Sequence, residues 1–429
     1  MLKKIVSFMI FFVVLFSSLF FSASANYTLN SNGSDVDSYY LYNFENNLYM
    51  AEYGVETIIA PSATVKMMTA CVALEAGIDT GKVITVNSDM LDGVTGRTMN
   101  LKAGDRLTVL DLLYATVCGG YNDASQSLAF AVSGSLSDFI AKMNEKASQL
   151  DMTATNYLNV TGMDEAGMHT CVLDIIKLAK HLAKNDTFVN ISSASTYKLS
   201  DIATCDKKTI SNRSSLLSSY KGLSNFCTGS GDFGGCNVLY YKRSDLSFLC
   251  IVMGASSKND DDDIACAEDF SRELLSHALY DYSYKTVLSE KSAVASLPVM
   301  YSSASENIDL YLQGDVKVYI PKDIDEKNDL TYNYYVYGDG LKAPLKSGDE
   351  VGEMIVSYDG RTLACVPLIV KDDVERSGFL YFLDIIKNYV KSPAFISSCV
   401  IFVCLMIAYY LYMQRLFKVV IHRSSKKQR

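Results

Sequence analysis

A segment near the C-terminus, residues 394–413, contains no charged side chain. About 20 apolar residues are enough for a helix to cross a bilayer, so this segment predicts a transmembrane helix. Six Lys and Arg residues follow it within residues 414–429. Because basic residues beside a transmembrane helix stay in the cytoplasm, this tail is predicted to be cytoplasmic and the chain before the helix to lie on the other side of the membrane.

The N-terminus predicts export. Lys3 and Lys4 precede an apolar stretch over residues 5–21, and Ala23-Ser24-Ala25 forms a small-residue cleavage site. This is the pattern of a secretory signal peptide, here residues 1–25, and an uncleaved anchor is the alternative. We therefore expect a single-pass protein of the cell membrane, with an extracytoplasmic ectodomain and a cytoplasmic C-terminus.

Composition excludes some functions. The 429 residues carry a formal net charge of −9, and nucleic-acid phosphates are bound by a basic surface, so no nucleic-acid partner is expected. The four histidines, His169, His181, His277 and His422, include no pair at a metal-ligand spacing such as i, i+4. A zinc hydrolase is therefore disfavoured, and we expect neither a metal nor a cofactor.

The cysteines do not form an obvious disulfide framework. Two of the eleven, Cys399 and Cys404, lie in the predicted transmembrane helix, which leaves an odd number in the ectodomain. Most of the others lie in apolar runs, which is typical of buried free thiols. One disulfide, such as Cys227 with Cys236, remains an alternative.

The ectodomain divides by pattern into two parts. Residues 26–283 mix helix and strand patterns and predict an α+β domain, in which the apolar runs 236–242 and 246–253 form a hairpin. Residues 284–374 contain short strands and turns throughout, which is typical of a small β-sandwich. The amphipathic residues 375–393 are expected to lie on the outer face of the membrane.

Several helix starts can be placed from their capping residues. Thr108 and Asp111 form a capping pair before one apolar helical pattern. Ser62 follows Pro61 at the start of another, and Asn122 begins a third. Serine and asparagine are favoured N-cap residues, so capping is one interpretation of Ser62 and Asn122.

Residues 60–69, Ala-Pro-Ser-Ala-Thr-Val-Lys-Met-Met-Thr, resemble the first motif of the low-molecular-weight penicillin-binding proteins. These are the serine D-alanyl-D-alanine carboxypeptidases of peptidase family S11. Further similar stretches follow in the family's order, at residues 100–106, 111–114, 121–124, 139–150, 159–162 and 252–255. The resemblance covers nearly all of residues 40–390. It implies a penicillin-binding and β-lactamase-like transpeptidase domain, a helical cluster with an antiparallel sheet, followed by the family's β-domain and acting at peptidoglycan.

Catalysis in this family depends on the motifs Ser-x-x-Lys, Ser-x-Asn and Lys-Thr-Gly. The first serine attacks the peptide carbonyl and needs a neighbouring base to take its proton. Lys66 matches the lysine of the first motif, but Ala63 occupies the position of the serine. The nearest hydroxyl is one position earlier, on Ser62.

The other two motifs also differ. Asn122 matches the second motif, but Gly120 occupies its serine position. The third motif is expected after Gly222-Leu223, which places it at Ser224 and Asn225, without a lysine. Residues 228–231, Thr-Gly-Ser-Gly, are a shifted alternative that also lacks one.

The sequence therefore predicts a membrane-anchored homologue with little or no hydrolysis, in which Lys66, Asn122 and Ser62 are vestigial catalytic residues and Ser224 and Asn225 lie at the substrate. Its partner would be a peptidoglycan stem peptide or an envelope protein. The alternative is an active carboxypeptidase with Ser62 as a shifted nucleophile. A structural spacer is a third class: an open polar cleft at Lys66 favours binding, whereas a cleft filled by Phe226 and Met67 favours the spacer.

Overall fold

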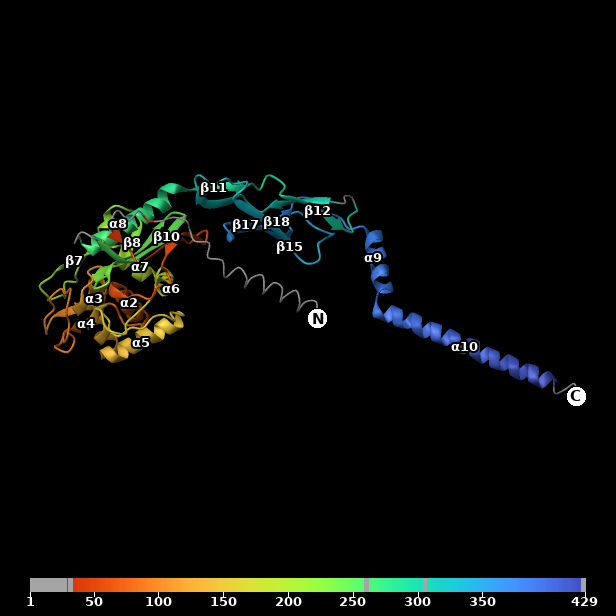
Figure 1. Ribbon diagram of the computed structural model, residues 1–429, viewed down its shortest axis with the longest axis horizontal. Helices are drawn as coiled ribbons and strands as arrows, with labels where there is room; N and C mark the ends of the chain where they lie inside the picture. The colour runs from red at the N-terminus through yellow and green to blue at the C-terminus, as the bar shows by residue number, and fades with distance from the viewer. Residues whose placement is uncertain (1–28, 30–33, 258–261, 304–306, 426–429) are drawn as a thin grey trace. The chain divides into compact units, whose positions relative to one another are not determined.

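The computed structural model describes residues 29, 34–257, 262–303 and 307–425 (Figure 1). The expected signal peptide, residues 1–25, and the last four residues of the basic tail lie outside the described residues. The described chain divides into two compact units. The first runs to Lys285 and also includes Val318–Thr331 and Ser357–Ala364. Because these two segments cross the expected boundary, the division into 26–283 and 284–374 stays a prediction.

An antiparallel sheet forms the centre of the first unit, with the order β3-β2-β10-β9-β8 and with β1 paired to β10. Its strands are β1 (Ser34–Asp35), β2 (Ser38–Asn43), β3 (Leu48–Tyr53), β8 (Leu223–Gly231), β9 (Gly234–Arg243) and β10 (Leu246–Ser257). The predicted hairpin is confirmed, since Arg243 of β9 pairs with Leu246 of β10. All six residues of β2 are buried, so this strand is covered on both faces.

Helices cover the two faces of this sheet (Figure 1). The helical elements of the first unit are η1 (Ser62–Thr64), α2 (Val65–Glu75), α3 (Val109–Val117), α4 (Asn122–Ser133), α5 (Leu136–Gln149), α6 (Val172–Leu182), α7 (Asp186–Ser193), η2 (Ser215–Ser218), α8 (Asp263–Ser276) and η3 (His277–Asp281). Along β9, the Asn237 Nδ2 donates a hydrogen bond to Ser271 Oγ of α8 at 3.1 Å. The neighbouring side chains of Cys236 and Val238 belong to the hydrophobic core that also contains α2. Side chains alternate across a strand. Helix α8 therefore covers one face and the helical cluster the other.

The expected capping pair is confirmed. The backbone N–H of Asp111 donates to Thr108 Oγ1 at 3.0 Å, and the Thr108 N–H donates to Asp111 Oδ2 at 2.9 Å. Each of these two hydrogen bonds pairs a backbone N–H at the start of α3 that would otherwise have no partner. Short antiparallel pairs complete this unit: β4 (Val83–Thr85) with β5 (Arg106–Thr108), and β6 (Thr196–Lys198) with β7 (Thr209–Ser211).

The C-terminal β-domain contains a sheet with the order β15-β17-β18-β13-β12-β16 and a separate pair, β11 with β14. Its strands are β11 (Tyr282–Leu288), β12 (Ala295–Met300), β13 (Asn307–Leu312), β14 (Val316–Pro321), β15 (Leu330–Val336), β16 (Leu341–Lys342), β17 (Glu350–Tyr358) and β18 (Arg361–Val370). These strands agree with the short strands and turns expected over residues 284–374.

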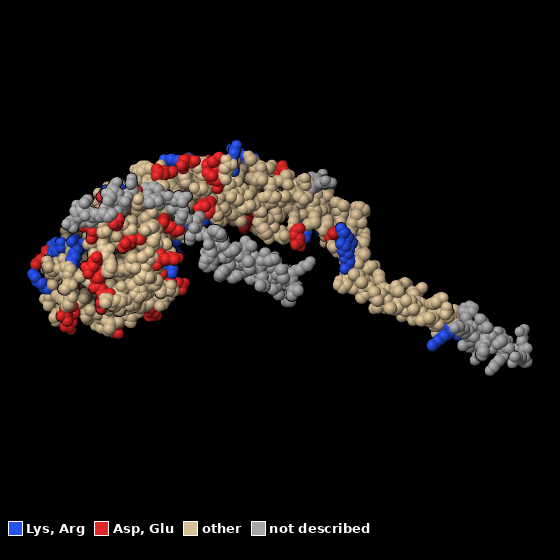
Figure 2. All heavy atoms as spheres, viewed as in Figure 1, with Lys and Arg blue, Asp and Glu red and all other residues tan. Residues whose placement is uncertain are grey.

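Two helices end the described chain, α9 (Gly378–Val390) and α10 (Pro393–Ser425). Pro393–Arg415 is a 23-residue stretch with mean hydropathy 2.3, long and apolar enough to cross a membrane. Figure 2 shows α10 with few charged side chains along it. In the sequence, Lys391 precedes the apolar stretch and Arg415 ends it. None of the side chains of α9 is buried.

Candidate functional site

A cavity of about 410 Å³ lies where the start of α2, the start of α4 and the end of β8 meet. Ala63, Lys66 and Asn122 line it, together with backbone at Gly120. The structure thus brings the first and second sequence motifs to one cavity. Phe226 and Met67 do not fill it, since both are buried in the core and neither belongs to its lining.

Ser62 lies behind this cavity. Its side chain is 5% exposed, its Oγ has no hydrogen-bond partner other than the neighbouring Cys236 thiol, and it is not among the lining residues. Its backbone has φ = +47°, a left-handed conformation that is costly for a residue with a side chain. The Ser62 carbonyl also packs against Gly162 so closely that a Cβ on Gly162 would overlap it.

The capping interpretation of Ser62 is wrong. No side chain caps η1 or α2, whose N-cap residues are Pro61 and Thr64. The strained backbone at Ser62 turns the chain so that the next residue, Ala63, faces the cavity. A hydroxyl at 63 would be presented there, and the methyl group of alanine is presented instead.

Lys66 is buried on the first turn of α2. Its ammonium donates to the carbonyl of Thr161, and no carboxylate within the described residues pairs with it. Burial lowers the pKa of Lys66 to about 8; the nearby Cys227 opposes this, and the positive charges of Arg213 and Arg97 add to it. At neutral pH the cavity therefore holds a cation that loses its proton readily.

Asn122 is the first residue of α4, and it is not a cap, because the N-cap position is Tyr121 and carries no side-chain hydrogen bond. Its Nδ2 donates to the Thr95 carbonyl at 2.7 Å, which fixes the orientation of the amide. The other end of the amide, Oδ1, is buried and has no partner. An unpaired buried acceptor is costly unless a ligand supplies a donor.

The third-motif residues expected from the sequence are not at the cavity. Ser224 and Asn225 are buried in β8, where Asn225 Oδ1 accepts from Thr228 and Nδ2 donates to Asn212. The part of β8 that reaches the cavity is its end, through Ser230 and Gly231. Gly229 lies against Ala63 so closely that a Cβ on it would overlap the alanine methyl group.

This geometry favours Thr228-Gly229 as the last two residues of the third motif, with Cys227 in place of its lysine. The register of β8 against β9 shifts between Asn225 and Cys227, so that Phe226 is an extra residue there. Counting forward from Gly222-Leu223 misses this bulge, which is why the sequence placed the motif too early. The Thr-Gly pair itself was the signal that could have found it.

Cys227 and Cys236 lie behind the first motif as free thiols with their Sγ atoms 4.0 Å apart. Hydrogen bonding to Cys236, together with burial, raises the pKa of Cys227. The same hydrogen bond lowers the pKa of Cys236, which also lies beside Ser62 and the Ala63 N–H. The lysine position of the third motif is thus occupied by a buried, uncharged group.

Four charged residues that line the cavity were not found from the sequence: Arg97, Asp164, Arg213 and Asp232. Arg97 precedes the segment 100–106, Arg213 lies on the loop before η2, and Asp164 follows Gly162. Single charged residues in loops carry no periodic signal. Only their proximity in sequence to recognised segments, as for Arg97 three positions before residue 100, could have drawn attention to them.

Residues 34–257 match the family model described as D-alanyl-D-alanine carboxypeptidase, and residues 282–376 match the C-terminal domain of penicillin-binding protein 5. The first match spans more than half of the chain. The chain belongs to the D-alanyl-D-alanine carboxypeptidase family, peptidase S11.

Individual relatives agree with this assignment. The chain is 27% identical over 331 residues to the D-alanyl-D-alanine carboxypeptidase DacF of Bacillus subtilis, covering 76% of this chain and 82% of the relative. It is 28% identical over 381 residues to DacC of Escherichia coli, covering 86% and 91%. Among solved structures, penicillin-binding protein 5 of Haemophilus influenzae shares the fold with a TM-score of 0.58 at 21% identity, covering 81% of this chain and all of that one.

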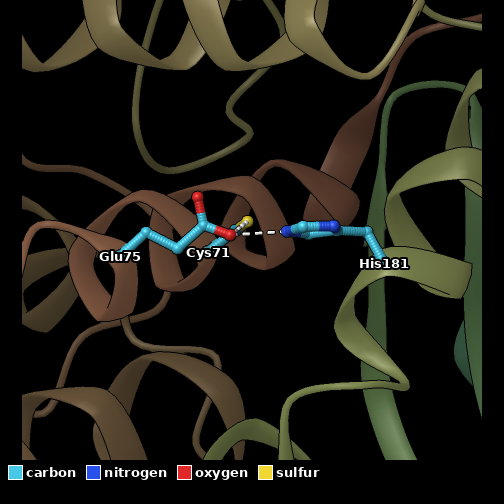
Figure 3. A group of neighbouring side chains, drawn as sticks. All are labelled: Cys71, Glu75 and His181. Atoms are coloured by element: carbon cyan, nitrogen blue, oxygen red, sulfur yellow. Dashed lines mark hydrogen bonds and ion pairs between the residues drawn. The ribbon is translucent and has the colours of Figure 1, made fainter.

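A second cluster of chemically active side chains lies away from this cavity, between α2, α5 and α6 (Figure 3). Possible ligand atoms of Cys71, Glu75 and His181 lie within 4.8 Å of one another. His181 Nε2 is 2.5 Å from Glu75 Oε1, and Lys146 Nζ is 2.6 Å from Glu75 Oε2. Because the ammonium already occupies one carboxylate oxygen, and because burial raises the pKa of Cys71 to about 12, we interpret the cluster as an ion-pair network that joins three helices.

The charge state of Lys66 predicts a pH-dependent stability difference. Its folded-state pKa of about 8 lies below the ordinary 10.5, so between these values the unfolded chain holds a proton that the folded chain has released. The penalty of burying the charge, on the order of 3 kcal/mol at about 1.4 kcal/mol per pKa unit, is therefore complete below pH 8 and relieved as the pH rises towards 10.5. We expect Lys66→Met to gain stability relative to the wild type at pH 7, and this gain to shrink by pH 10.

Chemical denaturation of both proteins at the two pH values measures this change. Lys142→Met, at an exposed position on α5, is the control. A difference between Lys66→Met and wild type that is the same at pH 7 and pH 10 would show that Lys66 carries no buried charge.

The ion-pair network predicts a pH dependence of the opposite sign. Burial opposes ionisation of Glu75, but hydrogen bonds from Lys146 and His181 lower its pKa below the ordinary 4.5. The stabilisation is therefore present above that value and lost as the pH falls through the folded-state pKa. We expect Glu75→Gln to cost on the order of 1 kcal/mol at pH 7, since the carboxylate is partly exposed, and less at pH 3. Thermal unfolding at the two pH values tests this, with the exposed Glu145→Gln as the matched control.

Proposed function

We propose that this protein is exported, anchored in the membrane by α10, and binds peptidoglycan stem peptides in the cavity without hydrolysing them at a rate comparable to its active relatives. The observation that carries the proposal is Ala63, whose methyl group lines the cavity at the position of the nucleophile. A methyl group cannot form an acyl-enzyme, and a family mechanism that begins with acylation cannot begin without a nucleophile.

The losses extend beyond the nucleophile. Gly120 removes the hydroxyl of the second motif, and Cys227 removes the positive charge of the third. Catalytic residues of this kind act as a unit, so losing one already removes several orders of magnitude in rate. Absence of all three groups favours binding over slow hydrolysis.

The cavity retains what a peptide ligand needs. It is open, polar and lined by Lys66 and Asn122, rather than filled by apolar side chains, which favours a binding role over a structural spacer. Its volume lies within the usual range for small-ligand sites, about 300–1,000 Å³. The unpaired Asn122 Oδ1 can accept a hydrogen bond from a peptide N–H.

Anchoring is supported by the C-terminal helix. A 23-residue apolar stretch is about 35 Å long as a helix, which is sufficient to cross a bilayer. The basic residues that follow it favour a cytoplasmic C-terminus, and they therefore favour a position of the preceding chain outside the cytoplasm, where peptidoglycan lies.

An active carboxypeptidase is the second candidate, and one observation favours it. Ser62 Oγ lies beside the Cys236 thiol, forms no further hydrogen bond, and lies four residues before Lys66. To act as nucleophile it would have to rotate the backbone of η1, which the contact between the Ser62 carbonyl and Gly162 opposes.

Covalent labelling distinguishes the two candidates. We expect the purified protein, incubated with a fluorescent penicillin and read by intact mass, to form no adduct, and the variant Ser62→Ala to behave identically. An active member of the family treated in parallel shows that the reagent is competent. An adduct that forms on the wild type and disappears in Ser62→Ala would establish Ser62 as the nucleophile and overturn our proposal of a non-hydrolytic cavity.

A further inference from the structure

Positive charge is concentrated on one side of the cavity. Lys66 is buried at its base, Arg213 is half-buried in its wall, and Arg97 is exposed at its edge. The three charges affect one another: burial and the charge of Arg97 lower the pKa of Arg213, and both arginines lower the pKa of Lys66. Three cations held this close repel one another unless an anion lies between them.

Within the described residues, the charge of Asp262 acts on Arg213 and opposes the lowering of its pKa, but no carboxylate forms a salt bridge with Lys66, Arg97 or Arg213. The Arg213 guanidinium forms no hydrogen bond or salt bridge with the described chain, and its Nη1 lies 3.8 Å from the position of a Cβ on Gly120 and 3.4 Å from that on Gly229. Because neither glycine has a side chain, no side chain at position 120 or 229 covers this guanidinium. Serine at 120 would extend a side chain towards it.

Arg97 is held in place by other means. Its Nε donates to the Gly119 carbonyl at 2.8 Å, and its guanidinium lies 4.9 Å from the centre of the Tyr121 ring. These contacts use one of its five N–H donors and orient its planar group. The remaining donors stay available at the edge of the cavity.

The acidic residues of the cavity occupy a different place. Asp164 lies beside Gly231 and accepts from the Asp232 N–H at 2.7 Å. The cavity thus has a basic part, at Gly120 and Gly229, and an acidic part, at Gly231. A ligand with one anionic end is oriented by this arrangement.

We infer that Arg97 and Arg213 bind the terminal carboxylate of the peptide ligand. This inference rests on the proposed function. Guanidinium groups match a carboxylate in both charge and geometry, because each can donate two parallel hydrogen bonds. With the carboxylate between the arginines, the rest of the peptide lies beside Asn122, which lines the same cavity.

The first test changes the ligand and leaves the protein intact. The probes are diacetyl-L-lysyl-D-alanyl-D-alanine with a free C-terminal carboxylate and the same peptide with a C-terminal carboxamide. Binding to the full-length protein in detergent is measured by isothermal titration calorimetry. Because hydrogen bonds to a charged group are stronger than neutral ones, we expect the free acid to bind about tenfold or more tightly than the amide.

The second test changes the protein. Arg97→Gln and Arg213→Gln keep a polar side chain of similar length and remove the charge, and Arg106→Gln changes an exposed arginine on β5 that does not line the cavity. We expect each cavity variant to lose most of the preference for the free acid while binding the amide as the wild type does. The control variant keeps the preference. Unfolding midpoints confirm that each variant is folded before titration, and Arg97→Met, which also removes the charge, replaces Arg97→Gln if the latter does not fold.

The outcomes separate the two proposals. Equal binding of acid and amide to the wild type, or an unchanged preference in both cavity variants, overturns the carboxylate assignment and leaves peptide binding intact. Failure of the wild type to bind either peptide overturns the proposed function and the carboxylate assignment with it. A preference that is lost in the cavity variants and kept in Arg106→Gln supports the assignment.

Discussion

The contact between the end of β8 and the first turn before α2 determines the shape of the site. Gly229 and Ala63 approach so closely that no side chain fits at 229, and Gly162 approaches the Ser62 carbonyl in the same way. These contacts hold η1 between a strand and a loop and maintain the left-handed backbone at Ser62. Strain of this kind persists only where the surroundings over-determine it. The site is therefore preorganised for presentation of residue 63, whatever side chain that residue carries.

Much of the fold followed from the sequence, because it depends on periodic patterns. The hairpin of β9 and β10 and the capping pair at Thr108 are both confirmed. The membrane-spanning length of the C-terminal apolar segment also agrees with the prediction. The predictions that failed concern features that change when a strand shifts by one residue, or that depend on contacts between residues far apart in the sequence. The bulge at Phe226 moved the third motif, and the left-handed Ser62 could not be distinguished from a helix cap without its contact to Gly162.

The cavity combines a retained framework with altered chemistry. Lys66 and Asn122 occupy the positions that the motifs predict, whereas Ala63 and Gly120 stand where the motifs have serine. Arg97 adds a charge at the edge of the cavity. Under the proposed function, chemistry that requires a nucleophile would be lost, whereas recognition through charge and hydrogen bonding would be kept.

The length of α10 has a consequence for the strength of binding that such a cavity needs. A ligand-binding domain that is anchored in a membrane is confined to the space next to that membrane. Peptidoglycan in the same space carries many copies of the same stem peptide. Short tethers of this kind give effective concentrations of roughly millimolar. If α10 spans the membrane as proposed, a cavity with a dissociation constant near that value would already be half occupied. Weak, rapidly reversible binding would then be sufficient for the protein to remain at the wall while moving along it.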